Sequence, residues 1–194
     1  YRGIEYPKEQ ERGYAYKEDL YVPGYFEVNI KKGESIVFAA STSRIKPSAM
    51  KKLFDEEVGY RPPRDNFYHT LISSAHQFFI RKDNHDYILA GYPWFKCRAR
   101  DMFISLPGLT LAVEEIEKFE QVMKTAGEAL NNFLIGKPLQ ADIAEIDQPD
   151  IPLWAVWAIQ QYAHSVGREK CYEKYGKLVE TIVSCIENGK HENI

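Results

Sequence analysis

The stretch GYPWFKCRARDMFISLPGL, residues 91–109, joins an aromatic loop to a segment with helical spacing. Tyr92, Trp94 and Phe95 flank Pro93, which favours a loop rather than a helical face for these rings. Flat rings in a loop suit the apolar faces of sugars, but they also serve as core packing. The segment therefore raises the possibility of a ligand rim beside the start of a helix, with core packing as the ordinary alternative.

The Arg100-Asp101 pair follows at the first turn of a helix expected from about residue 100 to 111. An acidic residue is favoured at a helix N-terminus by the helix macrodipole, and Arg100 could simply pair with Asp101 at the surface. These residue types alone do not separate a structural role from a binding role.

Hydrophobic spacing predicts that the chain is helical beyond residue 60, apart from its loops. We expect Ser48 to cap a helix that runs through Val58, and Asp65 to cap a longer one. The helix capped by Asp65 would bury one face made of Phe67, Leu71, Ile72, Ala75, Phe78 and Phe79. Two long loops, 83–99 and 136–149, are where function is expected. Further helices are expected at 100–111, 113–135, 151–166 and 168–188.

The first 45 residues have a different pattern. Two runs with strand-like alternation, Tyr25–Ile30 and Ser35–Ala40, are separated by the turn Lys31–Glu34 and predict a β-hairpin. Residues 1–19 are polar and aperiodic, which indicates loop or irregular edge strand. A hairpin of this size does not bury a core alone.

Composition narrows the class of partner. The 194 residues carry a net charge of −3, which gives no basic footprint for nucleic acid or anionic lipid. Cys97, Cys171 and Cys185 have neither disulfide-type nor zinc-type spacing, so we expect reduced thiols in a cytoplasmic protein with no metal and no cofactor. We also expect no membrane span and no export signal.

Three segments, in this order, resemble the glycogen debranching enzyme family of prokaryotic type, with its amylo-α-1,6-glucosidase domain. RGYAYKEDLYVPGYFEVNIKKGESIVFAAS (12–41) is similar to the end of the β-sandwich domain that precedes the helical barrel. ILAGYPWF (88–95) with RDMFISLPGLTLA (100–112) resembles the family's Ala-Gly-Tyr-Pro-Trp-Phe and Gly-Arg-Asp segments. PDIPLWAVWAIQQY (149–162) resembles its Val-Asp-Ala-Ser-Leu-Trp segment.

The resemblance implies a mainly α fold, part of an (α/α)6 toroid preceded by a β-hairpin remnant. Residues 1–45 would end a β-sandwich domain, 46–63 would form a linker with a helix, and 64–194 would form the N-terminal half of the catalytic barrel. Twelve helices with their connections need roughly 200 residues. About 130 follow the linker, so we expect half a barrel and an internal fragment of a larger enzyme.

The family's activity is hydrolysis of α-1,6-linked glucose at a branch point, with inversion. This chemistry requires a carboxylic acid and a carboxylate about 6.5–9.5 Å apart. The resemblance places Asp150 as the general acid and the partner base beyond Ile194, so the chain alone should be inactive. It also implies that the substrate, a branched α-glucan, is bound by Tyr92, Trp94, Phe95, Arg100, Asp101 and Trp154.

Within that site, Asp101 would accept hydrogen bonds from sugar hydroxyls and Arg100 would orient it. The sequence departs from the family pattern at Met102, where a threonine is usual, and at Pro152, where a small polar residue is usual. Residues 96–98, Lys-Cys-Arg, also replace a segment that usually includes a tryptophan.

Asp150 also has a structural interpretation, as the N-cap of the helix that begins at Ile151. A helix N-terminus lowers the pKa of a carboxyl group, which opposes an acid role unless burial raises it. The Trp154 and Trp157 spacing of three is more typical of a core. Two alternative functions stay open: a non-catalytic helical module that binds carbohydrate or docks a partner, and a different (α/α)6 glycosidase or lyase. Uncovered helix faces would favour self-association.

Overall fold

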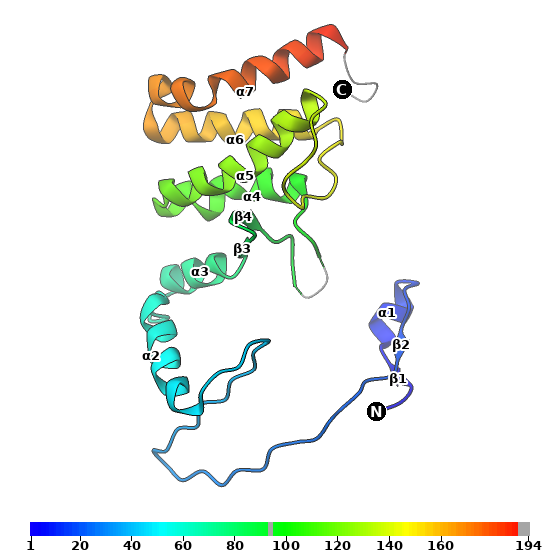
Figure 1. Cartoon of the computed structure of the whole chain (residues 1–194), viewed down its shortest axis with the longest axis vertical. Helices are drawn as coiled ribbons and strands as arrows, with labels where there is room; N and C mark the ends of the chain where they lie inside the picture. Colours follow the sequence, from blue (N-terminus) through cyan, green and yellow to red (C-terminus); the bar gives the residue numbers. More distant parts are fainter. Residues whose placement is uncertain (93–94, 190–194) are drawn as a thin grey trace. The chain divides into compact units, whose positions relative to one another are not determined.

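The computed structural model describes residues 1–92 and 95–189, and the chain is mainly helical, as predicted (Figure 1). It divides into two compact units, Tyr1–Val58 and Gly59–Ile194. None of the helices in the described part combines the length and the apolar content that crossing a bilayer requires.

The first unit begins with a small ordered motif where the sequence predicts irregular structure. Strands β1 (Ile4–Glu5) and β2 (Lys17–Glu18) pair antiparallel on either side of helix α1 (Pro7–Glu11). The Tyr6 hydroxyl donates a 2.5 Å hydrogen bond to Glu18, and Lys17 forms an ion pair with Glu5. These contacts are exposed to solvent, and the motif buries no hydrophobic residue.

The predicted hairpin at Tyr25–Ala40 is only partly present. Its turn forms, since the Glu34 N–H donates to the Lys31 carbonyl, and the Phe26 and Phe38 rings meet edge to face at 5.0 Å. The flanking segments have no strand ladder and both rings are largely exposed, so the prediction of two strands was wrong. Two isolated strands without a sheet or helix to cover them are marginal in water.

Both predicted N-caps were misplaced. Ser48 lies inside a short 310-helix, Pro47–Ala49, which leads directly into α2 (Met50–Tyr60). Helix α3 (Phe67–His76) is capped by Asn66 rather than Asp65, and the Asn66 side chain accepts a hydrogen bond from the His69 backbone N–H. Asp65 Oδ1 instead lies 2.5 Å from His69 Nδ1.

The predicted buried face of α3 is present only in part. Phe67 and Leu71 are exposed, Ile72 and Ala75 are half-buried, and Phe79 packs against the core from outside the helix. The chain turns into a β-hairpin, β3 (Phe79–Lys82) and β4 (His85–Ile88), within a stretch that we expected to be helix end and loop. Its two-residue turn, Asp83-Asn84, has positive φ at both positions, as a type I′ turn requires.

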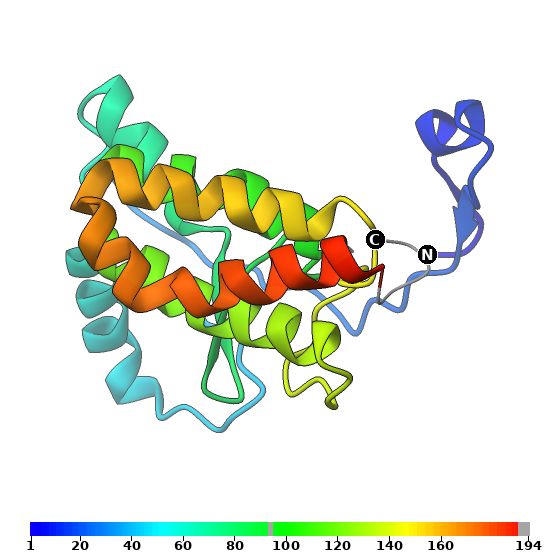
Figure 2. The same cartoon turned by 90° about the horizontal axis from the view of Figure 1, so that it is seen from above.

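Four helices form two layers around the core. They are α4 (Ala99–Leu109), α5 (Ile116–Leu134), α6 (Ile151–Val166) and α7 (Arg168–Asn188), with a 310 turn at Leu111–Val113 between the first two. Alternate helices pack together, α4 with α6 and α5 with α7, and α6 also packs along α7. Figures 1 and 2 both show α6 and α7 side by side. The predicted limits of the last two helices match the structure, and those of the first two differ by one to three residues.

The core lies between these layers. Its largest fully buried side chains include Phe103 from α4, Phe119 from α5 and Tyr162 from α6. The Phe119 and Tyr162 rings stack at 4.9 Å, and Tyr175 from α7 meets the Tyr162 ring edge to face at 5.2 Å. This core fixes the start of α4 beside the start of α6, which is where the candidate site lies.

Candidate functional site

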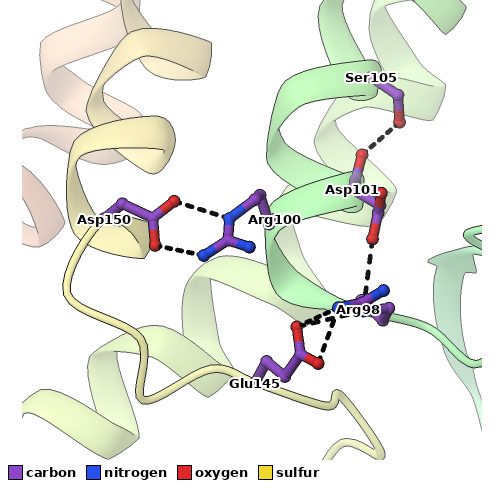
Figure 3. A network of polar contacts seen from close by, with 6 residues as sticks. All are labelled: Arg98, Arg100, Asp101, Ser105, Glu145 and Asp150. Atoms are coloured by element: carbon purple, nitrogen blue, oxygen red, sulfur yellow. Dashed lines mark hydrogen bonds and ion pairs between the residues drawn. The ribbon is translucent and has the colours of Figure 1, made fainter.

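A two-point ion pair connects the first turn of α4 with the start of α6 (Figure 3). Arg100 Nε donates to Asp150 Oδ2 at 2.7 Å, and Arg100 Nη2 donates to Asp150 Oδ1 at 2.8 Å. Trp154, one turn into α6, donates from its indole N–H to Asp150 Oδ2 at 3.0 Å. The structure therefore brings together three of the residues predicted from the sequence, and both oxygens of Asp150 accept hydrogen bonds.

A second ion pair lies beside the first. Arg98 Nε and Nη2 reach the carboxylate of Glu145 at 3.1 and 2.7 Å. The backbones join as well, because the Ala99 N–H donates to the Ala144 carbonyl and the Ala144 N–H donates to the Cys97 carbonyl. The loop between α5 and α6 is thus attached to the segment that starts α4.

Asp101 does not pair with Arg100, contrary to the surface pairing considered from the sequence. Its carboxylate lies 3.7 Å from Arg98 Nε, and its backbone carbonyl accepts a hydrogen bond from the Ser105 hydroxyl (Figure 3). Arg100 and Asp101 also line a small pocket of about 270 Å³ beside β4 and α4. The rest of its lining is mostly apolar: Phe78, Ile88, Leu89, Ala90, Ile104, Ser105 and Leu109.

The ion pair lowers the pKa of Asp150. The hydrogen bonds from Arg100 are the largest cause that lowers the pKa of this carboxyl, and with the Trp154 contact they bring it from 3.8 to about 2 despite partial desolvation. Asp150 stands at the N-cap position of α6, but its side chain makes no capping hydrogen bond. A carboxyl with the ordinary pKa is already ionised at neutral pH, and Arg100 extends the ionised state of Asp150 to lower pH.

Two aromatic residues of the predicted rim, Tyr92 and Phe95, make their contacts with other residues than Asp150. The Tyr92 hydroxyl donates to the Gln77 carbonyl at 2.6 Å, and its ring tilts against Phe78. Phe95 is about half exposed and packs close to Gly91. Trp94, also predicted from the sequence to bind substrate, lies outside the described residues.

Sequence reasoning missed Arg98 and Glu145. Glu145 carries no local motif, and its left-handed backbone (φ 59°) is unusual for a non-glycine residue. The position of Arg98 just before a predicted helix was an available signal. Nothing in the sequence pointed to its partner Glu145, which lies 47 residues away.

Within residues 1–92 and 95–189, no group of three or more His, Cys, Asp or Glu side chains is arranged to hold a metal ion.

Comparison with known families gives two matches. A profile described as amylo-alpha-1,6-glucosidase matches residues 72–193, more than half of the chain. A profile described as glycogen debranching enzyme N terminal matches residues 1–37. Comparison with curated proteins and with solved structures gave no match. The first matched range includes both ion pairs of the site.

Proposed function

The chain belongs to the amylo-alpha-1,6-glucosidase family, and we propose that it forms part of the catalytic domain of a glycoside hydrolase that releases α-1,6-linked glucose at branch points of an α-glucan. The observation that carries the proposal is the Arg100–Asp150 pair, which holds one carboxylate in a fixed orientation at the N-terminus of α6. Acid/base hydrolysis of a glycoside requires a positioned carboxyl pair, and Asp150 is our candidate for one member.

The arrangement of the helices supports an (α/α)6 toroid as the architecture. In such a barrel, helices alternate between an inner and an outer ring, so each helical hairpin contributes one helix to each ring. Here α4 packs with α6 and α5 packs with α7, as two consecutive hairpins of a double ring would. The loops that precede α4 and α6 then lie at the same end, which is where we place the substrate.

The chemistry of Asp150 depends on Arg100. While both guanidinium contacts last, Asp150 is a carboxylate, which suits activation of water or acceptance of hydrogen bonds from a sugar. Donation of a proton to the glycosidic oxygen requires that substrate binding both displaces Arg100 and raises the pKa of Asp150 well above its ordinary value of 3.8. We therefore propose Asp150 as a catalytic carboxylate whose pKa is lowered by Arg100.

The remaining candidates act on substrate position. Asp101 leaves part of its carboxylate exposed beside a small pocket, where sugar hydroxyls can donate to it. Trp154 is half-buried and meets Trp157 edge to face at 5.8 Å, so it both packs and binds Asp150. Tyr92 and Phe95 are exposed rings that we place at the outer edge of the substrate site, with Trp94 between them in sequence.

The proposal is tested with the full-length protein and a branched limit dextrin that carries single α-1,6-linked glucose units. We expect free glucose, released first as the β-anomer and followed by proton NMR, because inversion converts an α-linkage to β-glucose. A linear α-1,4 oligosaccharide is the control and should not be hydrolysed. Release of α-glucose first, or equal action on both substrates, would contradict the proposed reaction.

A non-catalytic carbohydrate-binding or docking module is the second candidate. It is favoured by the same ion pair, since a carboxylate paired with Arg100 can have the purely structural role of connecting two helices. Under this alternative, Asp150→Asn would weaken folding but leave carbohydrate binding and any activity of the full-length protein unchanged. In either case, neutral sugars should bind with little dependence on salt.

A further inference from the structure

A second polar groove lies away from the Arg100–Asp150 site. Helices α5 and α7 lie side by side (Figure 2). The groove runs between them and has a volume of about 980 Å³. Its lining comes from these two helices and from Gln140 in the loop after α5. None of the residues of the two ion pairs lines it, so its ligand would be bound separately.

The charges of the groove balance. Its lining includes three carboxylates, those of Glu117, Glu120 and Glu128. It also includes three ammonium groups, those of Lys124, Lys174 and Lys177. Glu120 is already used within the protein, because it accepts a hydrogen bond from the Tyr162 hydroxyl and forms an ion pair with Lys174. A groove without net charge offers little attraction to a phosphate or a nucleic acid, and this favours a neutral ligand.

The groove also presents side-chain amides that are not used by the protein. Asn131 and Asn132 are half-buried, Gln140 is exposed, and none of the three makes a side-chain hydrogen bond to another residue in the described part of the chain. An amide offers both donors and an acceptor, which matches sugar hydroxyls because each of these also donates and accepts.

Apolar surface adds an independent observation. Tyr175 lines the groove, but its hydroxyl oxygen is covered by the protein, so only the ring can contact a ligand there. Met123 and Leu178 supply further apolar surface, as the less polar faces of a sugar ring require.

We propose that the groove between α5 and α7 is a second binding site for a neutral oligosaccharide, separate from the catalytic site. Its volume is at the upper end of the range of about 300–1,000 Å³ for ligand pockets, which favours several sugar units over one. The choice of an α-glucan among neutral oligosaccharides rests on the proposed function. Such a site would hold one branch of a glucan while another branch is cleaved.

The test is titration of the 194-residue chain with maltohexaose, followed by NMR of the side-chain amide signals. We expect the Asn131, Asn132 and Gln140 signals to shift. The double variant Asn131→Ala/Asn132→Ala should weaken binding about tenfold, since it removes two or more neutral hydrogen bonds. Alanine also favours helix, so the variant should fold. Asn188→Ala, on α7 and outside the groove lining, is the matched control and should bind normally.

A second variant tests the role of the Tyr175 ring. Tyr175→Phe keeps the ring and removes only the covered hydroxyl, so it should bind maltohexaose as the original chain does. Unchanged binding in the double variant would overturn the proposal, as would the absence of binding at about 10 mM sugar. Loss of all binding in Asp150→Asn would place the sugar at the first site and overturn the groove equally.

Two further arms separate this inference from the proposed function. Cellotetraose and maltotetraose distinguish an α-glucan site from a general sugar site. Groove binding of maltotetraose without any hydrolysis by the full-length protein would retain the second site and contradict the proposed reaction. Hydrolysis by the full-length protein without any groove binding would support the proposed reaction and contradict the second site.

Discussion

The Arg100 guanidinium holds both oxygens of the Asp150 carboxylate, at 2.7 and 2.8 Å, although the two residues are 50 positions apart in the chain. Arg100 lies in the first turn of α4, and Asp150 is at the N-cap position of α6. The contact therefore connects the N-termini of these two helices. About 35% of the Asp150 side chain and 42% of the Arg100 side chain stay exposed, which leaves the pair open to a substrate.

Asp150→Asn should lower turnover on an α-1,6 branch by about 10²–10⁴-fold in the full-length protein, the range typical of acid/base groups. Asparagine keeps the size of the side chain and one acceptor for Trp154. Asp147→Asn, in the same loop and exposed, is the matched control and should leave turnover unchanged. Steady-state kinetics with near-normal turnover in Asp150→Asn would reduce Asp150 to a structural residue.

Glucosyl fluoride separates the two possible roles of Asp150. Fluoride leaves without a proton, so Asp150→Asn should lose much less activity on this substrate if Asp150 is the proton donor. If Asp150 acts as the ionised carboxylate that Arg100 favours, the loss should be similar on both substrates. The ratio of the two losses, measured as kcat, decides between the roles.

Acid should weaken the structure through the same pair. The folded-state pKa of Asp150 is about 2, below its ordinary value of 3.8, so the stabilisation is present above about pH 4 and is lost as the pH falls towards 2. Arg100→Gln should lower the melting temperature at pH 7 by about 2–4 °C, a modest value because the pair is partly exposed. The difference from the original chain should vanish near pH 2, and calorimetry from pH 2 to 7 measures it. A difference that stays constant with pH, or one equally large in the control Arg168→Gln, would contradict this.

Asp101→Asn should raise KM and also lower kcat, because the proposed role of this carboxylate is to hold sugar hydroxyls. A change confined to kcat would indicate that Asp101 itself takes part in proton transfer. Initial rates over a range of limit-dextrin concentrations distinguish these outcomes, with Asp147→Asn again as the control.

Two tyrosines in the same core should respond oppositely to loss of the hydroxyl. Tyr162 donates to Glu120, so Tyr162→Phe should reduce the free energy of unfolding by about 1–2 kcal/mol. The Tyr175 hydroxyl is buried and has no partner in the part of the chain that the structure describes, so Tyr175→Phe should leave stability unchanged or raise it. Urea unfolding of both variants checks the contrast, and an equal loss in the two would show that Tyr175 has a partner in solution.

The isolated 194-residue chain should self-associate. Two helices carry pairs of exposed apolar side chains: Phe67 and Leu71 on α3, and Leu153 and Trp157 on α6. Large exposed apolar patches are rare on monomeric proteins. Sedimentation velocity should show dimers or larger species at high concentration, and Leu153→Gln with Trp157→Gln should reduce them. A compact monomer at all concentrations would contradict this expectation.

Secondary structure was predictable where local signals were complete. The limits of α6 follow from Pro152 in the first turn and from Gly167 at its end, whose positive φ suits a residue without a Cβ. The β3–β4 hairpin was missed because Phe78 and Phe79 continue the helical spacing of α3, and a two-residue Asp-Asn turn is a weaker signal than Asn-Gly. In the first unit, alternation without a covering layer gave a turn but no ladder.

The sequence by itself determined the family, through its Tyr-Pro-Trp-Phe, Arg-Asp and Asp-Ile-Pro-Leu-Trp segments, and it determined the helical character through hydrophobic spacing. Only the tertiary structure decided which carboxylate Arg100 holds. Local spacing favoured its neighbour Asp101, but the packing of α4 against α6 brings Asp150 to the guanidinium and leaves Asp101 facing Arg98. Because the pKa of a carboxyl group depends on the charges within a few ångströms of it, that packing, rather than the sequence order, sets the pKa of Asp150.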